Sequence, residues 1–124
     1  MNKFEIYNMD AEEDLPIEIG KFPGGEIRVR LTSEYSSDSM VRIKAVILNS
    51  DDVMTLVMLT DALRTAGVEN IRLTMPYIPY ARQDRVCNKG EAFSLRVFAR
   101  IINALEFQSV VVWDAHSEVS TGWI

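Results

Sequence analysis

The sequence predicts a single α/β domain built on a parallel sheet, with a strand and a hairpin added at its N-terminal end. A length of 124 residues corresponds to one domain. From residue 43 onward, β-branched apolar runs alternate with segments that have helical spacing. Strands that alternate with helices in this way pair in parallel through right-handed crossovers. Ligands of such sheets bind beyond the carboxyl ends of the strands, so the segments that leave those ends are the candidate site.

The first part of the chain predicts short strands. Residues 3–8 alternate apolar and polar side chains, which is typical of a strand, whereas the acidic segment 9–14 is expected to be a solvated loop. Residues 17–20 and 26–31 also alternate with period two, and the turn sequence FPGG at 22–25 separates them. We therefore expect a β-hairpin that precedes the parallel part of the sheet.

The alternating part begins with the apolar run 43–48, which predicts a strand buried on both faces. Asn49 offers an N-cap oxygen to the helix that follows, and Gly67 suits its end. Met54 and Met58 on this helix are expected to pack in the core, with a subunit interface as the alternative. The elements expected after it are a strand at 70–75, a helix capped by Ser94 and a strand at 109–113.

The composition bears on partners and compartment. The net charge of −5 disfavours nucleic acid and anionic membrane surfaces, so we expect neither as a partner. Cys87 is the only cysteine, which excludes an intramolecular disulfide and fits a cytoplasmic setting. The N-terminus shows no apolar signal-peptide region, and no apolar run is long enough to span a membrane.

One loop of the predicted sheet is unusually long. The segment between Met75 and Ser94 far exceeds the usual connection of about 2–6 residues between a strand and a helix. It carries prolines, tyrosines and the cations Arg82, Arg85 and Lys89, which suit phosphate groups. The alternative is a rigid surface loop whose arginines pair with neighbouring acidic side chains, and composition alone does not choose between the two.

The same loop carries a resemblance to a known family. The stretch MPYIPYARQDRVCNKGE at 75–91 resembles the signature of the ribose-phosphate diphosphokinases, also called phosphoribosyl pyrophosphate synthetases. The segments GKFPGGEI at 20–27 and VVVWDAHS at 110–117 are similar to two further segments of that family, in the same order. The resemblance covers residues 17–124.

The resemblance implies a fold, an activity and site residues. Members of the family transfer the diphosphoryl group of ATP to ribose 5-phosphate with Mg²⁺, and they form oligomers. The implied fold is a three-layer parallel-sheet domain like that of type I phosphoribosyltransferases, and residues 1–124 correspond to the N-terminal domain, without the C-terminal domain. Arg82 and Gln83 would contact the nucleotide. Phe22 and Glu26 would form an adenine pocket donated by a neighbouring subunit, and His116 would ligate Mg²⁺.

The sequence also departs from the family pattern. Cys87 stands where relatives often carry an acidic residue that contacts the nucleotide, and Gly24 replaces the Asp or Asn that is common in the adenine loop. The usual first helix is missing between Asn8 and Pro16. We expect this chain by itself to lack synthetase activity, because the ribose-phosphate and pyrophosphate loops of the family are not in it. The alternative to half of an enzyme is a non-catalytic regulatory or assembly module.

Overall fold

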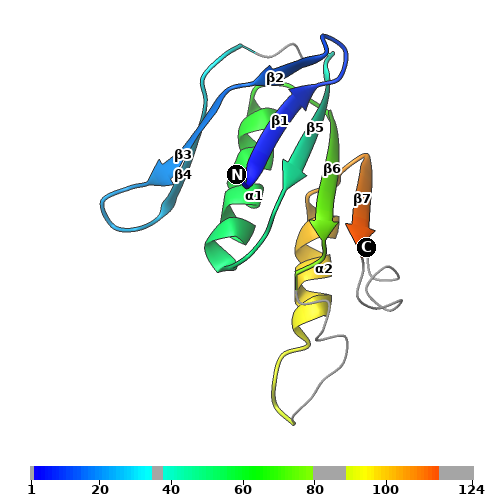
Figure 1. The fold of residues 1–124 in the computed structure, drawn as a ribbon. Helices are drawn as coiled ribbons and strands as arrows, with labels where there is room; N and C mark the ends of the chain where they lie inside the picture. Colours follow the sequence, from blue (N-terminus) through cyan, green and yellow to red (C-terminus); the bar gives the residue numbers. More distant parts are fainter. Residues whose placement is uncertain (1, 35–37, 80–88, 115–124) are drawn as a thin grey trace.

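The computed structural model describes residues 2–34, 38–79 and 89–114. These residues form seven strands and two helices (Figure 1). In chain order they are β1 (Phe4–Asn8), β2 (Glu13–Leu15), β3 (Ile17–Lys21), β4 (Ile27–Leu31), β5 (Met40–Ala45), α1 (Ser50–Thr65), β6 (Asn70–Tyr77), α2 (Ser94–Ala104) and β7 (Ser109–Asp114).

Five of these strands form one sheet in the order β2-β1-β5-β6-β7. β5, β6 and β7 run parallel, whereas β1 pairs antiparallel with both β5 and β2. The remaining strands, β3 and β4, pair antiparallel as a separate hairpin. The α/β class, the mainly parallel sheet and the predicted hairpin are therefore confirmed.

Both helices lie over the same face of the sheet. The order β5-β6-β7 advances in one direction, and right-handed crossovers that advance in one direction place their helices on one side. In Figure 1, α1 and α2 lie behind the strands, and no described element covers the near face. The described residues thus form two of the three layers that the resemblance implies.

The hydrophobic core lies between the sheet and this helical layer. Alternate side chains of β5 and β6 point into it and are inaccessible to solvent. The strand residues in question are Val41, Ile43, Ala45, Ile71, Leu73 and Met75, and the helices contribute Leu56, Leu59, Leu63, Leu95, Phe98 and Ile102. Each large side chain buried in this way stabilises the fold by roughly 1.5–3 kcal/mol.

The acidic segment 9–14 is not simply a solvated loop, as the sequence predicted. The side-chain oxygen of Asn8 accepts hydrogen bonds from the amides of Asp10 and Ala11, both at 3.0 Å, and closes a tight turn. Asp10 then accepts from the amide of Met40 at 2.8 Å. This turn reverses the chain, so that β2 returns along β1 as an edge strand in the segment where the family's usual first helix was predicted to be missing.

Helix α1 begins as predicted. Asn49 has extended backbone, and its side-chain oxygen accepts a hydrogen bond from the amide of Asp52 at 2.9 Å. Gly67 has a φ of 99° just beyond the end of the helix, which a residue with a Cβ adopts only with strain. The core-packing prediction for Met54 and Met58 is wrong, since they are 44% and 41% exposed on the side of α1 that faces away from the core.

Removing the cap of α1 is expected to destabilise the protein. Asn49→Ala should lower the free energy of unfolding by about 1 kcal/mol, because the amide of Asp52 loses its acceptor. Asn49→Ser keeps a capping oxygen and should stay within a few tenths of a kcal/mol of the wild type. Urea unfolding followed by circular dichroism measures both. Equal losses for the two variants would contradict a capping role.

The N-cap of helix α2 lies one residue earlier than predicted. The carbonyl of Phe93 accepts the first helical hydrogen bond, from the amide of Val97 at 3.1 Å, so Phe93 is the N-cap. Its side chain makes no capping hydrogen bond, and Ser94 lies inside the first turn. The prediction of Ser94 as a cap is therefore wrong, although the helix itself is confirmed, with Leu95, Phe98 and Ile102 buried on its inner side.

Candidate functional site

The tip of the hairpin β3–β4 holds two of the predicted site residues, Phe22 and Glu26. The amide of Gly25 donates to the carbonyl of Phe22 at 2.9 Å, and the amide of Phe22 donates to the carbonyl of Glu26 at 2.8 Å. Gly25 has a φ of 96°, the left-handed conformation that a three-residue hairpin loop needs at this position. Pro23 favours the first corner of the turn because its φ is fixed. The sequence FPGG therefore sets this tip locally.

The turn presents its aromatic ring to solvent. Phe22 is 50% exposed, and Glu26 is also exposed. A side chain at Gly24 would collide with the carboxylate of Glu26, which folds back over this glycine. The Gly24 departure therefore has a structural consequence: the carboxylate occupies the space in which a larger residue would stand. Since that carboxylate ends a flexible side chain, a residue at position 24 would move it and leave the turn intact.

The hairpin is fixed to the body of the domain on its apolar side. Ile17, Val29 and Leu31 pack against the core, and Ile27 is buried. At the hairpin tip, the ammonium of Lys21 lies 3.0 Å from the carboxylate of Asp51 in the first turn of α1. Both side chains are more than half exposed, so this ion pair adds little stability. Packing against α1 is thus the main anchor of the hairpin (Figure 1).

A polar cluster lies at the carboxyl end of β5, where the chain enters α1. The carboxylate of Asp52 is largely buried and accepts from the amide of Leu48 at 2.8 Å. It also contacts the ammonium of Lys3 at 3.1 Å, which reaches it from the start of β1. The sequence analysis missed this contact, because a partner 49 positions away leaves no local signal. The cluster closes the end of the sheet beside α1 and has its charges already paired.

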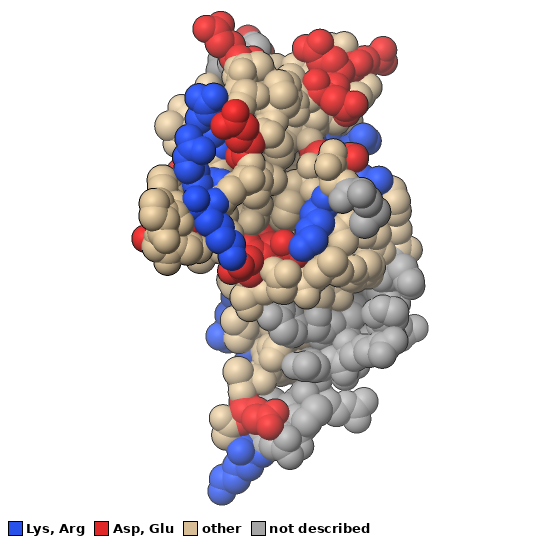
Figure 2. Space-filling model, turned by 60° about the vertical axis from the view of Figure 1, so that its left-hand side comes forward, with Lys and Arg blue, Asp and Glu red and all other residues tan. Residues whose placement is uncertain are grey.

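Charged side chains gather on the face of the molecule that carries the hairpin. Figure 2 shows basic side chains in a line down this face, with acidic side chains beside them at its lower end. Arg28 and Arg30 share one side of β4, and the guanidinium of Arg30 lies 3.2 Å from the carboxylate of Glu18 on β3. Since Arg28 and Arg30 are exposed and Arg30 is paired with Glu18, these side chains form a solvated surface and no enclosed anion site.

The other predicted site residues, Arg82, Gln83 and His116, lie outside the described residues. The strands that precede them are adjacent, because β6 and β7 run side by side and Tyr77 is the register partner of Asp114. The two segments therefore leave the sheet at neighbouring positions on its carboxyl edge. Figure 1 places the hairpin on the far side of α1 from this point. Within one chain, the described structure does not bring Phe22 and Glu26 together with the ends of β6 and β7.

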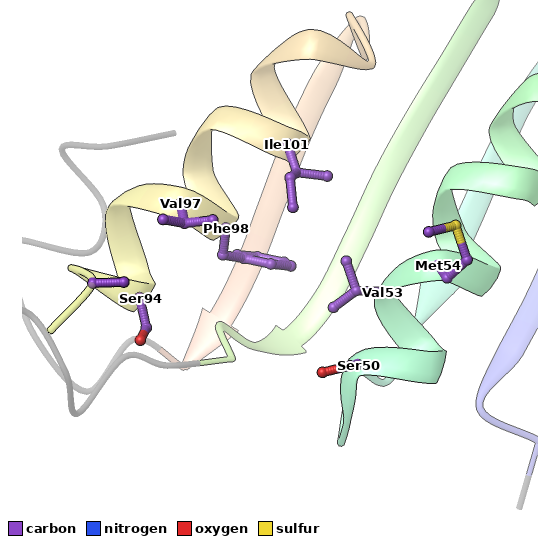
Figure 3. Close-up of a pocket in the computed structure, with 8 residues that line it drawn as sticks. Ser50, Val53, Met54, Ser94, Val97, Phe98 and Ile101 are labelled. Carbon is purple, nitrogen blue, oxygen red and sulfur yellow. The ribbon is translucent and has the colours of Figure 1, made fainter.

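The surface is hollowed between the two helices. The hollow has a volume of about 290 Å³ and lies between the first turns of α1 and α2 (Figure 3). Phe98 and Val53 face each other across it, and Met54 and Val97 line its outer parts. The lining is almost entirely apolar apart from Ser50 and Ser94, which does not suit a phosphate group. In residues 2–34, 38–79 and 89–114, no group of three or more His, Cys, Asp or Glu side chains could hold a metal ion.

No helix in the described part of the chain is both long and apolar enough to cross a membrane.

The comparisons with known proteins point to one family. The family model described as the N-terminal domain of ribose phosphate pyrophosphokinase matches residues 5–105. A ribose-phosphate pyrophosphokinase of Thermococcus kodakarensis is 34% identical over 114 residues, which are 91% of this chain and 39% of that protein.

A second relative and a solved structure agree with this match. A ribose-phosphate pyrophosphokinase of Ureaplasma parvum is 31% identical over 120 residues, covering 96% of this chain and 36% of its own length. The crystal structure of phosphoribosylpyrophosphate synthetase from Mycobacterium smegmatis has the same fold, with a TM-score of 0.75 at 21% identity, over 92% of this chain and 39% of that one. The chain thus spans less than two-fifths of the length of these relatives.

Proposed function

Because the chain belongs to the family of N-terminal domains of ribose-phosphate pyrophosphokinases, we propose that it forms the ATP-binding part of an enzyme that makes phosphoribosyl pyrophosphate. The enzyme transfers the diphosphoryl group of ATP to the anomeric hydroxyl of ribose 5-phosphate. It works in the cytoplasm, which the single cysteine supports. The ribose 5-phosphate site lies mostly outside residues 1–124.

The nucleotide site is built from two places in the fold. Arg82 and Gln83 contact ATP from the long loop after β6, with the guanidinium on phosphate oxygens. Phe22 stacks on the adenine, and the carboxylate of Glu26 accepts a hydrogen bond from its exocyclic amine. An exposed ring next to a carboxylate, on a turn that the backbone fixes, is what a flat base with an amine requires.

The two places belong to different subunits of a homo-oligomer. The observation that carries this proposal is the position of the hairpin, which lies across α1 from the ends of β6 and β7 (Figure 1). A ring that is 50% exposed on the outside of its own domain can reach the nucleotide of a neighbour. An adenine pocket shared between subunits therefore accounts for a binding residue that faces away from its own sheet edge.

His116 would hold Mg²⁺ at this site. Mg²⁺ usually binds through few protein ligands, and substrate phosphates and water supply the rest. When bound, the ion neutralises charge on the phosphates during transfer. The role of this chain is to bind and orient the nucleotide, since positioning and charge stabilisation dominate phosphoryl transfer.

Two departures from the family pattern favour a second function, a non-catalytic module that regulates or assembles active synthetase subunits. The carboxylate of Glu26 lies folded over Gly24, and Cys87 replaces an expected acidic contact, so both halves of the nucleotide site depart from the family. An assay of the natural protein with ATP, Mg²⁺ and ribose 5-phosphate separates the two functions. Product formation excludes the module, and nucleotide binding without product supports it.

Replacing Phe22 tests the adenine pocket. Phe22→Ala should weaken binding of a non-hydrolysable ATP analogue with Mg²⁺ by about tenfold, because stacking a base on an aromatic ring contributes roughly 1–3 kcal/mol. Calorimetric titration of the natural protein measures the affinity. Ile19→Ala is the matched control, since Ile19 is 44% exposed on the same hairpin and should change the affinity less than about twofold. Unchanged affinity in Phe22→Ala would remove the hairpin from the site.

A further inference from the structure

The tip of the hairpin offers a base a single side chain for hydrogen bonding. Its residues are all exposed, and they are Lys21, Phe22, Pro23, Gly24, Gly25 and Glu26. Proline and glycine have no side-chain donor or acceptor, and the ammonium of Lys21 is paired with Asp51 at 3.0 Å. Glu26 forms no ion pair within the described residues. Of the side chains at the tip, its carboxylate is therefore the one that is free to bond the edge of a base stacked on Phe22.

Gly24 determines where this carboxylate lies. A Cβ on residue 24 would lie 3.3 Å from Cδ and 3.5 Å from Oε2 of Glu26, and it would collide with Oε1. The backbone of Gly24 is not left-handed, whereas that of Gly25 is, with a φ of 96°. The turn itself thus requires glycine only at position 25. At position 24 the missing side chain leaves room for the carboxylate.

The ring of Phe22 does not choose between bases. It is 50% exposed at the outer end of the hairpin (Figure 1). Stacking on an aromatic ring tolerates every base, because each base has a π-face. Stacking alone also leaves a base able to rotate in its own plane. At this tip, the choice between adenine and guanine therefore depends on the carboxylate of Glu26.

This carboxylate suits guanine as well as adenine, because it accepts hydrogen bonds through both of its oxygens. Guanine presents two adjacent donors, N1–H and the N2 amine, so both oxygens can accept a charge-assisted hydrogen bond. Adenine presents its N6 amine beside N1, which is an acceptor, so only one oxygen is used. A side chain that selects adenine has a donor next to its acceptor, as an amide has. None of the side chains at positions 22–26 supplies such a pair.

We propose that the hairpin tip binds guanine as well as adenine, and that Gly24 is the residue that sets this low selectivity. The inference rests on the proposed function, because it assigns the substrate class of the same nucleotide site. That class is the purine nucleoside triphosphates. Adenine binds through one hydrogen bond to Glu26, and guanine binds through two after a rotation in the plane of the stack. A larger residue at position 24 would displace the pair of oxygens that guanine uses.

The affinities for two nucleotide analogues test the selectivity. Calorimetric titration of the natural protein, with Mg²⁺, compares non-hydrolysable analogues of ATP and GTP. We expect dissociation constants within about fivefold of each other, because the stacking on Phe22 is common to both. Glu26→Gln replaces two acceptors by an acceptor and a donor. This variant should increase the preference for the ATP analogue at least about tenfold, because guanine would leave a donor facing a donor.

Gly24→Asn tests the role of the missing side chain. By displacing the carboxylate, it should weaken binding of the GTP analogue at least about fivefold more than binding of the ATP analogue. Gly20→Asn is the matched control, because a Cβ on Gly20 of the same hairpin meets no atom within 4 Å. It should change the ratio of the two affinities less than about twofold. Circular dichroism checks that each variant is folded.

Four results would overturn the inference. The first is a GTP analogue that binds the unaltered protein more than about fivefold more weakly than the ATP analogue. If the ATP analogue then binds and Phe22→Ala weakens it, the proposed function stands and only the inference fails. The second is an unchanged preference in Glu26→Gln, and the third is an equal change of the ratio in Gly24→Asn and Gly20→Asn. The fourth is binding of neither analogue, which removes the proposed function as well.

Discussion

Phe98→Ala is expected to lower the free energy of unfolding by about 3–5 kcal/mol, which is the usual cost of truncating a buried phenylalanine. Phe98 is 1% exposed and packs with Leu95 and Ile102 into the core. It also borders the hollow between α1 and α2 (Figure 3), so its removal would enlarge a cavity of about 290 Å³. Urea unfolding followed by circular dichroism measures the loss.

Val97→Ala is the control for this prediction, because it removes apolar atoms from the adjacent position. Val97 is 44% exposed and lines the outer part of the same hollow. Its truncation should cost less than about 1 kcal/mol. If the two variants lost similar stability, α2 would not depend on Phe98 for its attachment to the sheet.

The order of strands and helices was readable from the sequence because each element has its own local pattern. The strands β5, β6 and β7 were found from their apolar residues, but the run 43–48 gave the wrong bounds for the first of them. β5 spans Met40–Ala45, and its Arg42 and Lys44 alternate with buried residues, so the prediction of a strand buried on both faces is wrong. The hairpin followed from a turn sequence whose residues fix their own backbone angles. The cap at Asn49 was equally local, since donor and acceptor are three residues apart.

The errors in the fold come from contacts that a local pattern does not contain. Strand β2 forms because Asp10 bonds to the amide of Met40, 30 residues further along the chain. The outward position of Met54 and Met58 depends on where the apolar stripe of Leu56, Leu59 and Leu63 meets the sheet. Apolar residues on both sides of a helix do not show which side is buried.

In the candidate site, too, the local features were predictable from the sequence and the long-range contacts were not. The shape of the hairpin tip, with Phe22 and Glu26 on a fixed turn, was predictable from the turn residues alone. The contact between Lys3 and Asp52 required the strand register. Strand register depends on long-range packing and turn geometry, so it is not predictable from a single sequence.

Arg82→Ala is expected to weaken binding of an ATP analogue with Mg²⁺ by about 10- to 100-fold, because a charged hydrogen bond to phosphate contributes roughly 1.5–3 kcal/mol. Arg82→Lys should fall between this variant and the wild type, because lysine keeps the charge but cannot bind two oxygens at once. Arg100→Ala, an exposed cation on α2, is the control and should leave the affinity unchanged. Calorimetry on the natural protein gives all four values, and equal affinity in Arg82→Ala and Arg100→Ala would exclude Arg82 from the site.

The pair Phe22→Ala and Arg82→Ala also tests whether the pocket is shared between subunits. If Phe22 serves the nucleotide bound by Arg82 of a neighbour, mixing the two variant proteins creates some sites that contain both natural residues. With random exchange in a symmetric oligomer, roughly a quarter of the sites should regain wild-type affinity. If both residues belonged to one subunit, every site would still lack one of them, and mixing would restore nothing. The hairpin's position across α1 from the ends of β6 and β7 leads us to expect restoration.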